Sequence, residues 1–313
     1  MAVEANERVW PRIVVVGSLN LDLVMQVEAF PKEGETLFGS GLSEVAGGKG
    51  ANQAAAVGKL GTAVSLIGKV GRDASGDKLI HSLQQAGVDT CALLPSDQPT
   101  GRALITVNAS GHNYIVVIPG ANADLTPFDI DEQRQVIEHC EMVVLQLEIP
   151  IETVAYTLRL AKRLGKTTIL NPAPAPAHQL SSELLQLVDF LIPNEHELQS
   201  LTGFQAVADP ASLEVAAQSL LELGAQAVLV TLGEKGCCYL DRQQVKTYPA
   251  RKVEAVDTTA AGDSFIAGFA VSYLQQRDLD AAVAYAQQVA AITVTRHGAQ
   301  SSLPTREEVE AFG

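Results

Sequence analysis

Residues 257–263 (DTTAAGD) place two aspartates around five small or hydroxyl-bearing residues, directly before a stretch, 264–274, whose composition favours a helix. The first N–H groups of a helix have no partner within it, and small residues let a ligand approach them, so the segment predicts an anion pocket. Asp263 would lie beside that pocket, where a carboxylate can accept the proton of a hydroxyl that attacks phosphorus. The alternative is a helix cap, but two aspartates exceed what a cap requires.

A glycine-rich segment lies earlier in the chain, at 46–53 (AGGKGANQ). It fails the Walker A pattern because Gly50, rather than Ser or Thr, follows Lys49. The dinucleotide fingerprint is also missing, since residues 17–20 (GSLN) lack its glycine spacing. Lys49 and Asn52 still offer directional donors beside accessible backbone, which suits a polyhydroxylated ligand, although a tight turn into a helix explains the glycines equally well.

Two polar residues follow the first apolar run, at the carboxyl end of a strand, where open α/β sheets bind ligands. Asn20 and Asp22 are two positions apart, so their side chains point the same way if the strand continues. An amide and a carboxylate together can bind a vicinal diol. The alternative is a solvated strand end with no ligand.

The elements that must position these residues follow from the pattern of apolar runs. Short β-branched runs alternate with longer stretches of helical period, and strands that are continuously apolar are typical of a sheet covered on both faces. The chain therefore predicts a three-layer α/β/α fold with a mainly parallel central sheet. Strands are expected at 13–16, 64–67, 142–147, 167–170, 188–192 and 227–231. Helices are expected at 50–60, 75–85, 151–164, 210–223, 261–275, 279–295 and 305–312.

Two segments depart from this alternation. Residues 24–42 contain one proline and three glycines without helical period, and residues 102–118 read as two strands, 103–107 and 114–118, around a turn. We expect one α/β domain over 1–313, with a small β lid formed by about 23–43 and 101–119 that closes over a site and excludes water. A plain decorative hairpin is the alternative.

Composition narrows the class of protein. Lys and Arg number 22 against 36 Asp and Glu, a net charge of −14, which argues against nucleic acid or an anionic membrane surface as a partner. The four cysteines form no C-x-x-C pair, so reduced thiols are expected. The first eleven residues lack an apolar secretory segment, and no apolar run is long enough to span a bilayer, so a cytoplasmic location is expected.

Taken in order, these motifs resemble the ribokinase family of carbohydrate kinases, the PfkB-type group, over nearly the whole chain. Residues 47–52 match the family's N-terminal signature, 257–263 its C-terminal signature, and 194–197 (NEHE) its magnesium–phosphate motif. Residues 171–175 (NPAPA) and 296–302 (RHGAQSS) complete a set of five matching segments. The resemblance implies transfer of phosphate from ATP to the O5 hydroxyl of D-ribose, with ADP and D-ribose 5-phosphate as products.

The resemblance also implies roles for individual residues. Asp263 matches the base, and the anion hole for the transferring phosphoryl group matches Ala260, Ala261 and Gly262. The positions that bind ribose match Asn20, Asp22, Gly48, Lys49, Asn52 and Glu148. The positions on the side of ATP and Mg²⁺ match Asn194, Glu197, Thr231, Gly233, Gly236 and Gln287. An activating K⁺ site matches Asp257, Thr259, Thr293, Arg296, Gly298 and Ser302.

Two positions depart from the family pattern. Many relatives have glycine at Ala260, and His or Asn is frequent at Gln287. The neighbouring helix N-terminus is expected to keep Asp263 ionised and weakly basic. The lid is implied to form a homodimer contact. A related kinase for deoxyribose or a nucleoside stays open as an alternative, as does a non-catalytic sugar-binding homologue, whereas a nicotinamide-dependent dehydrogenase is disfavoured by the missing fingerprint.

Overall fold

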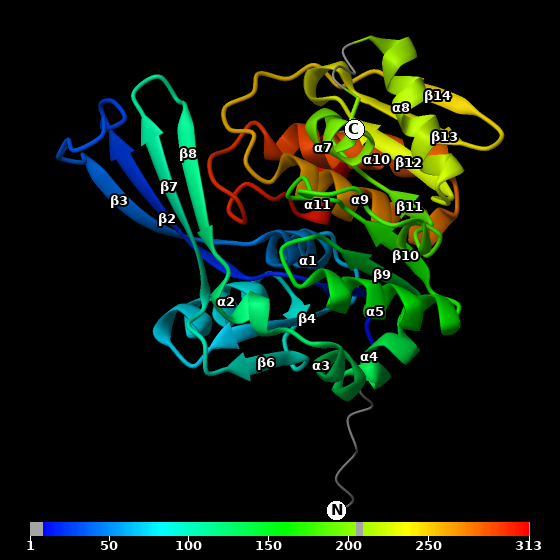
Figure 1. Ribbon diagram of the computed structural model, residues 1–313, viewed down its shortest axis with the longest axis horizontal. Helices are drawn as coiled ribbons and strands as arrows, with labels where there is room; N and C mark the ends of the chain where they lie inside the picture. The colour runs from blue at the N-terminus through cyan, green and yellow to red at the C-terminus, as the bar shows by residue number, and fades with distance from the viewer. Residues whose placement is uncertain (1–8, 205–208, 313) are drawn as a thin grey trace, which may run out of the picture.

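The computed structural model describes residues 9–204 and 209–312, and its central feature is a long twisted sheet (Figure 1). Its eight strands from β12 through β5 and β6 run parallel, and β13 and β14 continue one edge antiparallel. Along the sheet the order is β14 (Val245–Tyr248), β13 (Cys237–Asp241), β12 (Ala227–Thr231), β11 (Phe190–Leu191), β10 (Thr167–Leu170), β9 (Met142–Leu145), β1 (Ile13–Val16), β4 (Val64–Gly71) and β5 (Val88–Asp89), with β6 (Leu93–Ser96) also paired to β4.

Helices cover both faces of this sheet because successive strand side chains alternate between them. In β1, Ile13 and Val15 pack into one core, while Val14 and Val16 pack into the other. The first core is closed by α1 (Lys49–Lys59), α2 (Ala74–Gln85), α9 (Ala261–Gln276), α10 (Leu279–Thr293) and α11 (Arg306–Phe312). The second is closed by α3 (Pro127–Glu132), α4 (Arg134–His139), α5 (Ile151–Arg163), α6 (Ser182–Leu185), α7 (Glu195–Thr202) and α8 (Pro210–Glu222).

The predicted α/β/α class with its mainly parallel sheet is confirmed. The expected elements differ from those observed mainly at their ends, whereas helices α3, α4, α6 and α7 and strands β5, β6, β13 and β14 were not predicted. The run at 142–147 leaves the sheet after Leu145, and the run at 188–192 forms a strand only at Phe190–Leu191. Two short 3₁₀ helices, η1 (Gly120–Asp124) and η2 (Gly233–Lys235), were not anticipated. None of the described helices is long and apolar enough to cross a bilayer.

A second sheet of four strands stands apart from the helical layers (Figure 1). Its order is β3 (Gly41–Gly47), β2 (Asn20–Val27), β7 (Gly101–Asn108) and β8 (Asn113–Ile118). β2 and β7 are parallel, and the two outer pairs are antiparallel. The segment expected at 101–119 forms β7 and β8, but of the segment expected at 23–43 only the two ends are strand: β2 begins at Asn20 and ends at Val27, and β3 runs from Gly41 to Gly47. Both polar motifs of the N-terminal half therefore lie where this sheet meets the main body.

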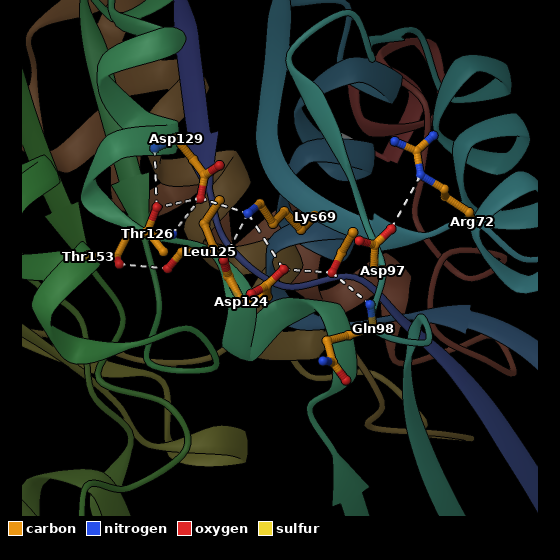
Figure 2. Close-up of polar contacts among 10 residues, drawn as sticks. Lys69, Arg72, Asp97, Gln98, Asp124, Leu125, Thr126, Asp129 and Thr153 are labelled. Carbon is orange, nitrogen blue, oxygen red and sulfur yellow. Dashed lines mark hydrogen bonds and ion pairs between the residues drawn. The ribbon is translucent and has the colours of Figure 1, made fainter.

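A polar cluster fixes the chain that returns from the second sheet (Figure 2). Lys69 of β4 donates to the Asp124 carbonyl at 2.9 Å and pairs with Asp129 Oδ2 at 2.8 Å. Ser96 of β6 donates to Asp124 Oδ2 at 2.7 Å. Lys69 and Asp129 are mostly buried, and the ion pair together with the hydrogen bonds from Thr126 holds the pKa of Asp129 below its usual range against the effect of burial. The cluster therefore holds η1 and the start of α3 against the central sheet.

Candidate active site

The start of α9 forms one wall of the site. Ala260 caps the helix in the left-handed region, with φ of 59°, a conformation that costs a non-glycine residue about 1–2 kcal/mol. Glycine at this position would avoid that cost. A Cβ added at Gly262 would meet no atom within 4 Å, so the backbone of this first turn faces open space. Ala260, Ala261 and Gly262 all line one large cavity, as the anion-hole hypothesis requires.

Asp263 lies in the same turn, nearly buried, with both carboxylate oxygens held by amides from α1. Asn52 Nδ2 donates to Oδ2 and Gln53 Nε2 donates to Oδ1, each at 3.0 Å. Burial raises the pKa of Asp263, while the charge of Lys49 and the two amide hydrogen bonds act in the opposite direction. The expectation of a weakly basic carboxylate was therefore wrong, because loss of solvent on burial raises the pKa of Asp263 more than Lys49 and the two donors lower it.

The residues predicted to bind sugar meet on the other side of Asp263, where the second sheet joins the main body. Asn20 is buried at the first position of β2, and its Oδ1 accepts from Asn122 Nδ2 of η1 at 2.8 Å. Asn122 also bonds to the N–H and the carbonyl of Leu19. This clamp leaves the Nδ2 group of Asn20 as the donor for a ligand.

Glu148 and Asp22 bring two carboxylates to the same place. Glu148 Oε2 accepts from Ser18 Oγ at 2.6 Å and from the Lys49 N–H at 3.1 Å. The Asp22 carboxylate lies so close to the Cα of Gly47 that any Cβ there would collide with it. Neighbouring Gly48 caps α1 with φ of 88°, which likewise favours glycine. The two adjacent glycines thus bring backbone, carboxylates and the start of α1 together.

Negative charge dominates this part of the site. Burial first, and then the charges of Glu148 and Asp263, raise the pKa of Asp22 to about 7. Lys49 is the cation among them, and the charges of Asp263, Glu148 and Glu197 raise its pKa despite burial. A neutral polyol with many hydroxyl donors suits such a set of acceptors, whereas an anionic sugar would be repelled.

A cavity of about 1170 Å³ opens on the far side of Asp263 and has the size of a nucleotide site. It is lined by predicted residues from α1, α7, β12, the η2 turn, α9 and α10: Lys49, Asn194, Glu197, Thr231, Gly233, Gly236, Ala260, Ala261, Gly262, Asp263 and Gln287. Gln287 Nε2 donates to the Tyr248 carbonyl at 3.2 Å, which holds this amide at the cavity wall.

The Asn194–Glu197 motif is a capping box at the start of α7. Asn194 Oδ1 accepts from the Glu197 N–H at 2.8 Å, and Glu197 Oε2 accepts from the Asn194 N–H at 2.9 Å. The motif therefore has a structural role of its own. Glu197 still lines the cavity, and burial raises its pKa. Its carboxylate oxygens are hard donors of the kind that Mg²⁺ takes from a protein while keeping substrate phosphates as further ligands.

The residues predicted for the cation site come from the loop before α9, from the last residue of α10 and from the loop that follows α10. Asp257 Oδ1 accepts from the Thr259 N–H and Oδ2 from the Gly298 N–H, both at 2.9 Å, so these three lie together. Thr293 and Ser302 are buried, with hydroxyls bonded to Val289 and Ala299 carbonyls. The Arg296 side chain instead forms a paired contact with Glu308, so only its backbone remains for a site here.

Sequence reasoning missed several residues of the site. Gln53, Gln146 and Asn171 form a buried amide cluster around Asp263, and Asn122 clamps Asn20. One signal could have found Gln146: it directly follows the apolar strand β9, at the sheet edge where ligands bind. Asn122 carries no such signal, because only the fold brings η1 to the start of β2.

Comparisons with known proteins agree with this geometry. A sequence profile described as pfkB family carbohydrate kinase matches residues 11–306. The chain is 40% identical over 302 residues to a ribokinase of Staphylococcus aureus, covering 95% of this chain and 98% of that one. It is 41% identical over 302 residues to a deoxyribokinase of Salmonella typhi, covering 96% and 98%. An Arabidopsis thaliana ribokinase complexed with ribose and ATP superposes with a TM-score of 0.91 at 32% identity, covering 97% and 99%.

Proposed function

The chain belongs to the pfkB family of carbohydrate kinases, and we propose that it is an ATP-dependent ribokinase, a phosphotransferase that converts D-ribose and ATP into D-ribose 5-phosphate and ADP. The observation that carries this proposal is the position of Asp263, buried between a polar, carboxylate-rich sugar side and a nucleotide-sized cavity. Similarity to ribokinases over nearly the full chain, and to one bound to ribose and ATP, supports it.

In the proposed reaction Asp263 accepts the O5 proton of ribose. The O5 oxygen forms a bond to the γ-phosphorus of ATP, the bond from that phosphorus to the bridging oxygen breaks, and ADP leaves with that electron pair. The first-turn backbone of Ala261 and Gly262 faces the cavity, so its N–H groups are available to the charge on the transferring phosphoryl group. Because such transition states are loose, positioning and electrostatics contribute more than strong basicity.

On the sugar side, Asn20 donates through Nδ2 and Asp22 accepts, which together suit a pair of adjacent hydroxyls. Lys49 and Asn52 add donors at the start of α1. Asn52 also donates to Asp263, so the bound sugar and the base share one support. A ribose with both its 2- and 3-hydroxyls fits this set better than a deoxyribose.

The residues present fit a divalent ion and a monovalent ion. Glu197 would hold Mg²⁺ together with the phosphates of ATP, and Asn194 and Thr231 lie beside it on the cavity wall. When bound, Mg²⁺ neutralises phosphate charge and orients the γ-phosphoryl group. For K⁺ the donors would be the Asp257 carboxylate and oxygens of the two loops that meet it: Thr259, Thr293, Arg296, Gly298 and Ser302. The loop that contains Asp257 and Thr259 directly precedes α9, so a bound cation would hold the proposed anion hole in place.

The second sheet is proposed to act as a lid on one α/β domain, since β2 carries Asn20 and Asp22 into the site from its base. The exposed apolar strand β8 is proposed to pair the lid with a second copy of the chain. A cytoplasmic location is proposed in keeping with the reduced thiols of Cys140, Cys237 and Cys238.

The first test measures ADP release with ribose, 2-deoxyribose and nucleosides, for the wild type and for Asp263→Asn. We expect ribose to be preferred, and the substitution to lower kcat about 10²–10⁴-fold while the protein stays folded, because it removes the proton acceptor. Glu222→Gln at the exposed end of α8 is the matched control and should leave kcat unchanged.

The outcomes separate the candidates. Preference for 2-deoxyribose would assign the activity of the 41% identical deoxyribokinase instead. Sugar binding without ADP release would favour a non-catalytic homologue. Near-normal turnover of Asp263→Asn would remove this residue from the mechanism but leave the substrate assignment intact.

A further inference from the structure

The two amides that hold Asp263 have different surroundings. Asn52 lies at the predicted sugar side, and its Oδ1 also accepts from Gln300 Nε2 at 3.5 Å. Gln53 is fully buried, does not line the large cavity, and has no role in the sugar or nucleotide set. Its Nε2 nevertheless donates to Asp263 Oδ1 at 3.0 Å. This amide therefore acts on the carboxylate without access to a ligand.

Gln146, immediately after β9, decides which way the Gln53 amide faces. Gln146 Nε2 donates to Gln53 Oε1 at 2.6 Å. If the Gln53 amide were turned over, its oxygen would face Asp263 Oδ1 and its NH₂ group would face that of Gln146, so both contacts would be repulsive. Asn171 agrees with this arrangement, since its Oδ1 lies 3.4 Å from Gln53 Nε2 and its own Nδ2 donates to the Ile192 carbonyl at 3.0 Å.

The arrangement carries a defect that an apolar core would avoid. Gln146 is fully buried, yet among the described residues no group donates to its Oε1. A buried acceptor without a donor destabilises a fold, and a leucine at this position would remove the penalty. The hydrogen bond from Gln146 to Gln53 is the contact that offsets this penalty, which points to a role in the site rather than in packing.

We propose that Gln53 is the positioning residue of Asp263, oriented by Gln146, and that this buried relay holds the carboxylate toward the incoming hydroxyl. The inference rests on the proposed function for the identity of that hydroxyl, but the relay itself acts on any acceptor that uses Asp263. Asn52 cannot replace it, because Asn52 holds the other carboxylate oxygen.

The charged groups around Asp263 determine how its pKa would respond to the loss of Gln53. Lys49 of α1 favours the ionised carboxylate, Glu148 opposes it, and Asp263 in turn acts on Glu197 of α7 and Asp22 of β2. The Gln53 hydrogen bond lowers the pKa of Asp263 against the larger effect of burial. Removing this donor would therefore raise the pKa of Asp263, because the ionised form loses a partner.

The test compares Gln53→Leu with the double variant Gln53→Leu/Gln146→Leu. We expect Gln53→Leu to lower kcat about 10–100-fold with the KM for the sugar within about twofold, since the base is misplaced while the sugar contacts remain. The acidic limb of the kcat/KM profile should move up by about one pH unit. The double variant should show the same kcat and pH profile as Gln53→Leu. It should unfold at a higher denaturant concentration than Gln53→Leu, because it also removes the unpartnered Gln146 amide.

Thr157→Val, which removes a buried hydroxyl of α5 that bonds within its own helix, is the control for loss of a buried hydrogen bond away from the site and should leave the pH profile unchanged. Carbon-13 titration of the Asp263 carboxyl, assigned with Asp263→Asn, measures the same shift without turnover, so failure of the proposed function and failure of the relay are distinguishable. An unchanged carboxyl titration in Gln53→Leu, or a double variant whose kcat falls well below that of Gln53→Leu, would overturn the proposal.

Discussion

Strands β1 and β8 are built from the same kinds of residue and lie in opposite surroundings. β1 (IVVV) is buried at all four positions, between β4 and β9 and under helices on both faces. β8 (NYIVVI) is exposed at all six, on the edge of the second sheet, with only β7 beside it. β-branched residues thus favour an extended backbone in both places, but they do not decide whether a strand is covered.

A similar contrast between buried and exposed positions exists within the second sheet. β2 starts at Asn20 inside the molecule, where it contributes to the site, and becomes progressively exposed toward Val27. The same sheet therefore has one buried polar end, at the candidate site, and one exposed apolar edge, at β8. The proposals of a lid and of a dimer contact apply to these two ends separately.

The largest contrast is expected from the same substitution in the two strands. Ile13→Ala in β1 leaves a cavity in a closed core and should lower the free energy of unfolding by about 2–5 kcal/mol. Ile115→Ala in β8, where the side chain is 53% exposed, should change it by less than about 0.5 kcal/mol in dilute monomer. Urea denaturation measures both. Equal losses would show that β8 is covered within the monomer.

A pH dependence should arise from the buried end of β2. The folded state binds the Asp22 proton more tightly, since the pKa is raised from 3.8 to about 7, chiefly by burial. The stability from this group is present below about pH 4 and is lost as pH rises through 7. Asp22→Asn should remove this loss, so its free energy of unfolding should gain on the wild type by at most about 1.4 kcal/mol per pH unit.

Denaturation curves of both proteins from pH 4 to 8 test this expectation. The low-pH points act as the internal control, because there the wild-type carboxyl is protonated and the two proteins should differ little. A constant difference across the whole range would mean that Asp22 titrates alike in the folded and unfolded chains.

The smallest effect concerns the exposed edge. Val116→Asp places a charge on β8, where the valine is 59% exposed, and should raise the dissociation constant of the proposed dimer at least tenfold, about 1.4 kcal/mol, while the monomer stays folded. Val215→Asp on α8, at 56% exposure, is the matched control. Sedimentation measures both, and a wild type that stays monomeric at micromolar concentration would remove β8 as an interface.

Much of the fold followed from local pattern. The strands at 13–16, 167–170 and 227–231 and the starts of α5 and α8 agree with expectation to the residue, because continuous apolar runs and periodic stretches are local properties. The strand expected at 188–192 was predicted too long, because Val188 and Ile192 are apolar and buried although they are not paired in the β ladder. Segment 28–40, without strand or helix, carries no apolar period from which a structure could be derived.

The candidate site likewise combines features that the local sequence predicts with features that depend on the fold. Motif residues that are proposed to act through backbone or a short turn, such as 257–263 and 194–197, are recognisable because their spacing along the chain is a local property of the sequence. The proton affinity of Asp263 cannot be recognised from the sequence, because it depends on burial by elements far apart in the chain.

The amino-acid sequence by itself determined the α/β class and the family, and it predicted the residues at the two ends of the proposed reaction, since each follows from local composition and spacing. Only the tertiary structure decided which apolar strand is covered, which way the Gln53 amide faces, and that burial raises the pKa of Asp263. The physical reason is common to all three: solvent exclusion and hydrogen-bond orientation arise from segments up to about two hundred residues apart, which meet only when the chain has folded.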